Sequence, residues 1–348
     1  MGTVDSSIAP TAQALAAEWP ARHPHPDPPG LAHTQPRSLI RSAVAAAAAF
    51  GSDPRHGQIL VLASLLAYGR AALGFDLSLA QIGFTIGGAL IAQRAATRWW
   101  RLPAFDARSA LISALSLCLL LRTDHPWLGA VAAAVAVLSK FVIRVRGKHL
   151  FNPTNLALIV MVLATGGSWM RPGGVWISPG QWGNTTLFAA LLACAGLGVV
   201  HRAARSDVTL AFIAGWLGVL FGRAAWLGQP WATPLHQLES GALVLFSFFM
   251  ISDPRTTPNA RIARILFGLA VALLAGVIQF VTYRTNAPLW ALVLLSPAVP
   301  FLDRAFPGAR HAWTANTPAT RPHPKGAPHE TPDPVARDRS HALARGRA

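Results

Sequence analysis

The sequence is poor in cysteine and in charged residues. Its two cysteines among 348 residues, Cys118 and Cys194, each stand alone within an apolar run. Isolated cysteines exclude a disulfide framework and a cysteine-rich metal site. Charged residues make up only 13% of the chain, whereas a soluble domain carries about 25%. With 52% hydrophobic residues, the composition indicates a chain that lies mostly in lipid.

Several motifs of enzymes and cofactor proteins are also missing. There is no cysteine spacing for an iron–sulfur cluster, no glycine-rich phosphate loop and no Ser/His/Asp set. His149 and His201 lie at the edges of apolar segments, which argues against a haem ligated by two histidines. Residues 1–37 are rich in Pro and His without an apolar core, so we expect no cleavable signal peptide.

The net charge of +16 would indicate nucleic acid in a soluble protein, but the basic residues concentrate in alternate loops between apolar segments. The loops of the other set hold only Arg122, Arg171 and Arg284. Cytoplasmic loops of membrane proteins are enriched in Lys and Arg. We therefore predict a multi-pass protein of the bacterial inner (plasma) membrane with both termini in the cytoplasm, the lipid bilayer as its partner and no nucleic acid.

The apolar segments predict an all-α, polytopic membrane protein with ten transmembrane helices. The expected spans are 58–76, 78–94, 107–122, 126–143, 153–168, 186–201, 208–227, 236–252, 262–283 and 287–302. Residues 1–37 are expected to form a disordered cytoplasmic tail, 38–57 an interfacial helix and its lead-in, 58–303 the ten-helix domain and 304–348 a disordered basic cytoplasmic tail. Ten spans divide into two sets of five, and an odd-numbered set is inverted when it is repeated, which predicts two inverted five-helix repeats.

A polar junction precedes the fifth span. It reads Lys148-His149-Leu150-Phe151-Asn152-Pro153-Thr154-Asn155. Asn152 can accept a hydrogen bond from the first free N–H groups of the helix, and Pro153 suits the first helical position. Because charges are costly in hydrocarbon, the basic residues before this junction are expected at the membrane surface (Lys140, Arg144, Arg146 and Lys148).

A second polar junction, Phe249-Met250-Ile251-Ser252-Asp253-Pro254-Arg255-Thr256-Thr257-Pro258, follows the eighth span. Thr257 and Pro258 predict the N-cap and first turn of the ninth helix. Asp253 ends the eighth span, where a carboxylate is unfavourable to the helix dipole and usually has a partner. Both junctions are expected on the cytoplasmic side and close together. They either hold a polar cofactor ring or serve only as caps and loop anchors.

The outer loop from residue 171 to residue 186 is rich in Gly, Pro and Trp. Its tryptophans are typical of an interfacial aromatic belt. A functional interpretation would use the hydroxyl of Thr185 or Thr186 at the start of the sixth helix. Arg70 and Arg223 fall within spans, where they either snorkel to the interface or face a cavity.

Two of these motifs resemble those of the RnfD/NqrB family, the ten-span membrane subunits of Rnf and sodium-pumping NADH:quinone oxidoreductase complexes. Phe151-Asn152-Pro153 opens an apolar helix that ends in Gly166-Gly167-Ser168-Trp169-Met170, and Phe248-Phe249-Met250-Ile251-Ser252-Asp253-Pro254 is followed by Phe267-Gly268. The resemblance covers roughly residues 52–302. It is closer to divergent members such as the membrane proteins that accompany enediyne biosynthesis.

The resemblance implies two flavin sites. In the family, flavin mononucleotide (FMN) is joined to a threonine of a Ser-Gly-Ala-Thr sequence on the outer side, and the matching place here reads Trp182-Gly183-Asn184-Thr185. Trp182 and Asn184 depart from that pattern, and the Asp expected upstream is missing. A non-covalent riboflavin on the cytoplasmic side would be served by Asn152, Asn155 and Asp253.

The resulting hypothesis is a membrane electron-transport subunit that passes electrons through bound flavin. Other membrane subunits of an Rnf-like complex would carry the NADH or ferredoxin sites, since nothing in this chain could bind a dinucleotide. The alternatives are a small-solute transporter or channel, because the family's fold is itself similar to urea transporters, and a structural subunit without cofactor.

Overall fold

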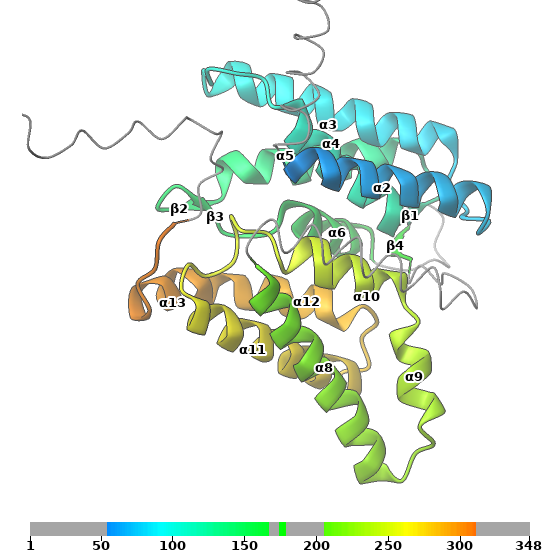
Figure 1. The fold of residues 1–348 in the computed structure, drawn as a ribbon. Coiled ribbons are helices and arrows are strands. Elements are labelled where there is room, and N and C mark those ends of the chain that lie inside the picture. Colours follow the sequence, from blue (N-terminus) through cyan, green and yellow to red (C-terminus); the bar gives the residue numbers. More distant parts are fainter. Residues whose placement is uncertain (1–53, 167–173, 179–204, 311–348) are drawn as a thin grey trace, which may run out of the picture. The chain divides into compact units, whose positions relative to one another are not determined.

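The computed structural model describes residues 54–166, 174–178 and 205–310, and this part of the chain is mostly helical (Figure 1). Its first half holds α2 (Pro54–Ala71), α3 (Leu79–Trp99), α4 (Ala107–Leu120), α5 (Trp127–Val142) and α6 (Pro153–Thr165). Its second half holds α8 (Ser206–Leu227), α9 (Ala232–Leu238), α10 (Gly241–Leu245), the π-helical turn η1 (Phe246–Met250), α11 (Arg261–Phe280), α12 (Ala287–Leu295), the 3₁₀ turn η2 (Ser296–Ala298) and α13 (Val299–Ala305).

Two short antiparallel pairs of strands join these helices. β1 (Leu121–Thr123) pairs with β4 (Val175–Ile177), with Arg122 opposite Trp176. β2 (Arg144–Val145) pairs with β3 (Lys148–His149) and forms a small ribbon between α5 and α6. The helical fold class predicted from the sequence is therefore confirmed, with these strands as local additions.

The expected spans correspond to helices wherever the structure describes them. The sixth span, the predicted tails up to residue 53 and from residue 311, and most of the 171–186 loop lie outside the described residues. The eighth span is broken into α9, α10 and η1, and the tenth into α12, η2 and α13. By length and composition, α8 and α11 are the two described helices that could cross a membrane, and several apolar helices are shorter.

Helix starts follow local capping chemistry at four places. Ser78, Asp106, Asn152 and Ser240 each accept a hydrogen bond from the backbone N–H three residues later, at the starts of α3, α4, α6 and α10. The start predicted at Thr257 and Pro258 is wrong, because α11 begins at Arg261. The Thr257 hydroxyl instead donates to the carbonyl oxygen of Asp253 at 3.0 Å, and the N-cap position of α11 is Ala260, which has no side chain that could cap the helix.

The two halves of the described chain share a packing pattern. In the first half α3 packs most extensively on α5, and in the second half α8 packs most extensively on α11. In both interfaces a glycine lies where the two helix backbones approach closely. A Cβ added to Gly88 would lie 2.6 Å from the Cα of Ala130, and a Cβ added to Gly268 would lie 2.7 Å from the carbonyl oxygen of Val208. Small residues of this kind let helix backbones approach closely in lipid.

We expect Gly268→Ala to lower the free energy of unfolding by about 1–3 kcal/mol, because the added methyl forces α8 and α11 apart. Thermal unfolding in detergent measures this effect. Gly218→Ala is the matched control, since a Cβ on Gly218 in α8 meets no described atom within 4 Å. The control should be neutral or slightly stabilising, as Ala favours a helix over Gly by about 1 kcal/mol. Equal effects of the two substitutions would contradict the close-approach explanation.

Two buried ion pairs tie together segments that are distant in the sequence. Arg264 in the first turn of α11 pairs with Asp207 in α8, and the two side chains are 11% and 12% exposed. Lys148 in β3 pairs with Asp303 in α13 at 2.9 Å, with side chains 11% and 15% exposed. Both pairs lie at the end of the helices where α6 and α11 begin, so they fasten the loops of that end.

Candidate functional site

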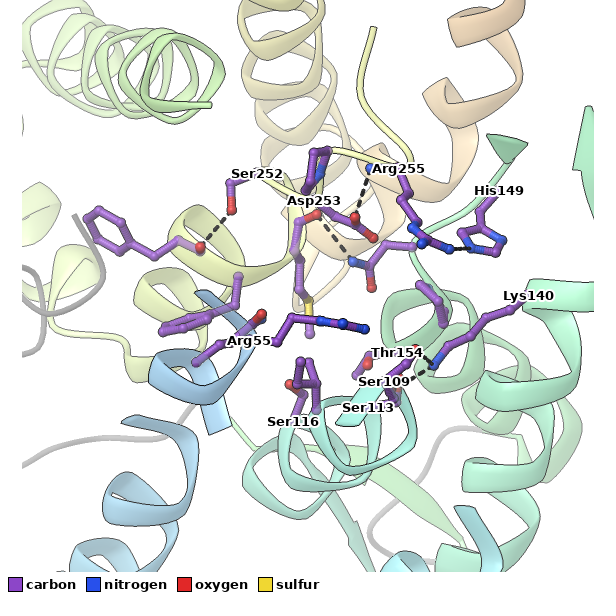
Figure 2. A pocket seen from close by; sticks show the side chains of 18 of the residues that line it. Arg55, Ser109, Ser113, Ser116, Lys140, His149, Thr154, Ser252, Asp253 and Arg255 are labelled. Carbon is purple, nitrogen blue, oxygen red and sulfur yellow. Dashed lines mark hydrogen bonds between the residues drawn. The ribbon is translucent and has the colours of Figure 1, made fainter. Parts of the chain in front are cut away.

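A polar cavity of about 120 Å³, cavity A, lies among α4, the first turns of α2 and α6, the last turn of α5 and the loop after η1 (Figure 2). Its polar lining comprises Arg55, Gln58, Asp106, Ser109, Ser113, Ser116, Lys140, His149, Asn152, Thr154, Ser252, Asp253 and Arg255. The cavity therefore draws residues from both halves of the chain, including both polar junctions found in the sequence.

The start of α6 is fixed by Asn152. Its side-chain oxygen accepts from the Asn155 N–H at 3.1 Å, and its amide nitrogen donates to the carbonyl oxygen of Met250 at 3.3 Å. Pro153 occupies the first turn, as predicted. One side chain thus caps α6 and joins it to the end of η1, so the expected approach of the two polar junctions is confirmed.

The second junction reaches cavity A through the π-helical turn η1. The N–H of Ile251 donates to the carbonyl oxygen of Phe246 at 3.0 Å, five residues back, which widens the turn. Ser252 then donates to the Phe248 carbonyl, and the Asp253 carboxylate accepts the N–H of Arg255 at 3.0 Å. Such π turns are rare and frequently occur at functional sites.

Cations from three elements line cavity A. Arg55 pairs with Asp106 at 3.0 Å, and Arg255 approaches Nε2 of His149 at 3.4 Å. Lys140 does not lie at a surface as expected, because its side chain is only 6% exposed. Its ammonium donates to the backbone and side-chain oxygens of Ser109 at 2.9 and 3.0 Å, so a polar protein interior takes the place of water around it.

Burial and the neighbouring cations shift the protonation of two groups in cavity A. Burial, followed by the charges of Arg255 and Arg144, lowers the pKa of His149 to about 4. His149 is therefore a neutral imidazole at pH 7. Burial raises the pKa of the Asp253 carboxyl, against the opposing effects of the Arg255 N–H and guanidinium.

The pKa of His149 predicts a loss of stability in mild acid. Between its ordinary value of 6.5 and about 4, the unfolded chain binds a proton at this ring and the folded chain does not. The free energy of unfolding should fall as pH falls through this window, by on the order of 1–2 kcal/mol near pH 5. Denaturation in detergent at pH 7 and pH 5 measures the loss. His149→Gln should remove it, whereas the same change at the exposed His125 should leave it; a loss that persists in His149→Gln would refute the assignment.

A larger cavity of about 600 Å³, cavity B, lies among α8, α10, α12, the end of α11 and β4. Five aromatic residues line it: Trp176, Trp216, Phe246, Tyr283 and Trp290. Two glutamines supply a polar wall, where the Gln279 amide donates to the Gln237 oxygen at 3.1 Å. The arrangement offers flat apolar surfaces, amide hydrogen-bonding groups and an exposed cation, Arg284, at the rim.

The residues singled out from the sequence are only partly brought together. Asn152 and Asp253 line cavity A, but Asn155 does not. Asn155 is 1% exposed, and its amide nitrogen donates to the Leu289 carbonyl of α12 at 3.0 Å, which indicates a packing role. Thr185 lies outside the described residues. Within the part of the chain that the structure describes, no group of three or more metal-ligating side chains occurs.

Sequence reasoning missed the burial of several cations, among them Lys140 and Arg122. Lys140 was expected at a surface, and Arg122 in an outer loop. Arg122 is 5% exposed in β1 and donates to the carbonyl oxygens of Cys118 and Leu121, both at 3.0 Å. The sequence could have indicated this contact, because Arg122 follows directly after an apolar helix and a cation is favourable beside the carbonyl groups of a helix C-terminus. Cavity B could not be predicted from any sequence motif, because its lining residues come from segments that are far apart in the chain.

Comparisons with known proteins agree with these motifs. The sequence profile of the NQR2, RnfD, RnfE family matches residues 172–310. Proteins named as a subunit of an ion-translocating oxidoreductase complex are 29% identical in Pseudomonas paraeruginosa, 27% in Ectopseudomonas mendocina and 26% in Alcanivorax borkumensis. Each similarity covers 56% of this chain and 72% of the relative. With the Asn152-Pro153 and Ser252-Asp253-Pro254 junctions meeting at one cavity, these matches show that the chain is similar to the NQR2, RnfD, RnfE family, whose profile it matches over its C-terminal part.

Proposed function

We propose that this chain is a membrane subunit of an ion-translocating oxidoreductase assembly and that it holds a flavin in cavity B. The relatives described above are each named as a subunit of such a complex. Cavity B is the observation that supports a cofactor: its volume of about 600 Å³ falls within the range of about 300–1,000 Å³ typical of ligand pockets. A bound flavin would supply the redox chemistry of an electron-transfer subunit.

The lining of cavity B fits a planar ring with a polar edge. Among its lining residues Trp216 and Phe246 are buried, and Trp290 and Trp176 are half-buried. Aromatic faces of this kind stack on a planar ligand and exclude water from it. The Gln237–Gln279 pair would bind the polar edge of the ring, and Arg284 at the rim would bind a phosphate ester.

Cavity A fits a flavin less well. Its volume of about 120 Å³ is below the range in which ligands of that size are found. The amide of Asn152 is occupied by its two backbone partners, and Asn155 does not line the cavity. The riboflavin site implied by the resemblance is therefore replaced in this proposal by cavity B. Covalent attachment of FMN to Thr185 remains part of the proposal as a second, separately testable step.

The membrane arrangement proposed is ten spans in two inverted five-helix repeats. The matching pairs α3–α5 and α8–α11, each closed by glycines, support the repeats. The exposed carboxylates of the described residues lie at or near the span ends expected outside: Asp124 in the connection after the third span, Asp76 at the end of the first span and Glu239 in the first turn of the eighth. Exposed arginines dominate the opposite loops, for example Arg101 and Arg146. This separation supports cytoplasmic termini by the preference for basic residues on that side.

The visible absorption spectrum of the purified protein tests the cofactor. We expect flavin absorption, with loss of most of the bound flavin in Trp290→Ala because the variant removes a stacking surface. Trp99→Ala is the matched control, since Trp99 is 82% exposed and does not line cavity B. A colourless but well-folded protein from flavin-replete cells, which also fails to take up added FMN or riboflavin, would refute the proposal.

Acid precipitation and in-gel fluorescence then test covalent attachment. Flavin that stays with the protein, and that Thr185→Val removes while Thr186→Val retains, would establish the phosphoester at Thr185. Complete release of flavin by acid would refute attachment and leave the non-covalent site in cavity B intact.

A further inference from the structure

Lys140 is a buried cation that forms no direct ion pair among the described residues, although the Asp253 and Asp106 carboxylates lie near enough to act on its charge. Its side chain is 6% exposed, and its ammonium bonds only to the two oxygens of Ser109. Ion pairs in the described part of the chain involve other cations. Burying a charge is costly unless an opposite charge compensates it. The third N–H of the ammonium is free, and Lys140 lines cavity A.

Two residues of the same cavity are buried as a whole but carry hydroxyl groups that form no hydrogen bond with a described residue and are not fully enclosed. Thr154, in the first turn of α6, is 5% exposed, and Ser116 of α4 is 6% exposed. Buried hydroxyls are normally satisfied. Because both side chains line cavity A (Figure 2), a ligand in the cavity would complete their bonding.

The charge around cavity A is positive. Arg55, Lys140 and Arg255 face Asp106 and Asp253, and the Asp106 carboxylate is bound to Arg55 while Asp253 accepts the N–H of Arg255. The N-terminus of α6, a helix of 13 residues, also begins at the cavity, and its dipole favours an anion there.

We propose that cavity A binds a small oxyanion of the phosphate or sulfate class, with the Lys140 ammonium and the Thr154 and Ser116 hydroxyls as its buried contacts. The cavity volume of about 120 Å³ admits such an ion and excludes a nucleotide or a flavin. Hydroxyl and ammonium donors that line cavity A from α4, α5 and α6 match the several acceptor oxygens of an oxyanion better than they match a halide. The site is independent of the flavin proposed for cavity B.

Thermal unfolding of the detergent-solubilised full chain at pH 7 tests the site. Sodium phosphate and sodium sulfate are titrated against sodium chloride at equal ionic strength. Because a ligand that binds only the folded state stabilises it by mass action, we expect a saturable rise in Tm of several degrees with the oxyanions and not with chloride. A rise that is equal for chloride would overturn the proposal.

Three variants identify the contacts. Thr154→Val should weaken apparent phosphate affinity at least tenfold, without loss of stability in phosphate-free buffer because the buried hydroxyl has no partner there. Lys140→Met should abolish the phosphate-dependent rise. Thr282→Val is the matched control, as its hydroxyl donates to the Ile278 carbonyl away from cavity A, and it should retain the full rise. An unchanged rise in both Thr154→Val and Lys140→Met would overturn the proposal even if either variant alone were poorly folded.

A phosphate group could reach cavity A as a free ion or as a lipid headgroup. Delipidated protein is therefore titrated in parallel with inorganic phosphate and with phosphatidic acid in mixed micelles. A Lys140-dependent rise with inorganic phosphate identifies a free-ion site, and one with phosphatidic acid alone identifies a headgroup site. The absence of a Lys140-dependent effect from either source contradicts an oxyanion site.

Discussion

Replacement of Arg264 by methionine should lower the free energy of unfolding by about 3–5 kcal/mol, the effect typical of breaking a buried ion pair. Nε of Arg264 lies 2.8 Å from each carboxylate oxygen of Asp207, and Nη1 donates to the carbonyl oxygen of Asn259. Methionine retains the volume of the stem but leaves the Asp207 carboxylate buried without its cation. Denaturation of the solubilised protein measures the loss.

The double variant Arg264→Met with Asp207→Asn should be more stable than Arg264→Met alone, since it removes the uncompensated charge. Glu239→Gln is the control for an exposed pair: His236 and Glu239 are 73% and 66% exposed, and such pairs contribute about 0–1 kcal/mol. A loss in Arg264→Met no larger than that of Glu239→Gln would show that the pair contributes little.

Lys148→Met is expected to cost about 2–4 kcal/mol. The Lys148 ammonium donates to Asp303 at 2.9 Å, to the Asn259 side chain at 3.1 Å and to the Thr257 carbonyl. It therefore joins the β2–β3 ribbon to the start of α11 and to α13. We expect α13 to become accessible to protease in the variant, which limited proteolysis detects before global unfolding.

Arg144→Met is the matched control, since Arg144 belongs to the same ribbon but is exposed. It should change neither Tm nor the cleavage pattern. Faster cleavage of α13 in both variants would assign the effect to the ribbon as a whole and not to the Lys148 contacts.

Helix positions could be predicted where their causes are local. The start of α6 follows from the cap at Asn152 and the proline after it, and α8 and α11 follow from long apolar runs. The break between α9 and α10 has a local signal that the span prediction overlooked, the polar stretch His236-Gln237-Leu238-Glu239-Ser240. The π turn at Phe246 could not be predicted, because it lies within a continuous apolar run. Ser240 caps α10, and the Thr209 hydroxyl of α8 donates to the Ser247 carbonyl at 2.8 Å, a contact between segments 38 residues apart.

The candidate site could also be predicted only in part. Alternate loops share one side of a membrane, so the meeting of Asn152 and Asp253 followed from the order of the spans. The burial of Lys140 did not follow, since the cost of a charge in lipid predicts a surface position. Lys140 is buried because Ser109 of α4 accepts hydrogen bonds from its ammonium. Ser109 lies 31 residues away, so the sequence around Lys140 does not reveal this partner.

The π-helical turn η1 sets the direction in which the residues after it point, and the site depends on that direction. A π turn accommodates one residue more than an α turn, so deleting a single residue within Phe246–Met250 would let α10 continue as a regular α-helix. Each residue of an α-helix advances about 100° around the axis. Because the π turn absorbs that extra residue, the deletion would keep Ser252 and Asp253 directed at cavity A. Closing η1 into an α turn at full length would instead rotate them away from the cavity and withdraw the Met250 carbonyl from Asn152. The hydrogen-bond register of this turn, and not its apolar composition, therefore decides whether the following loop reaches the site.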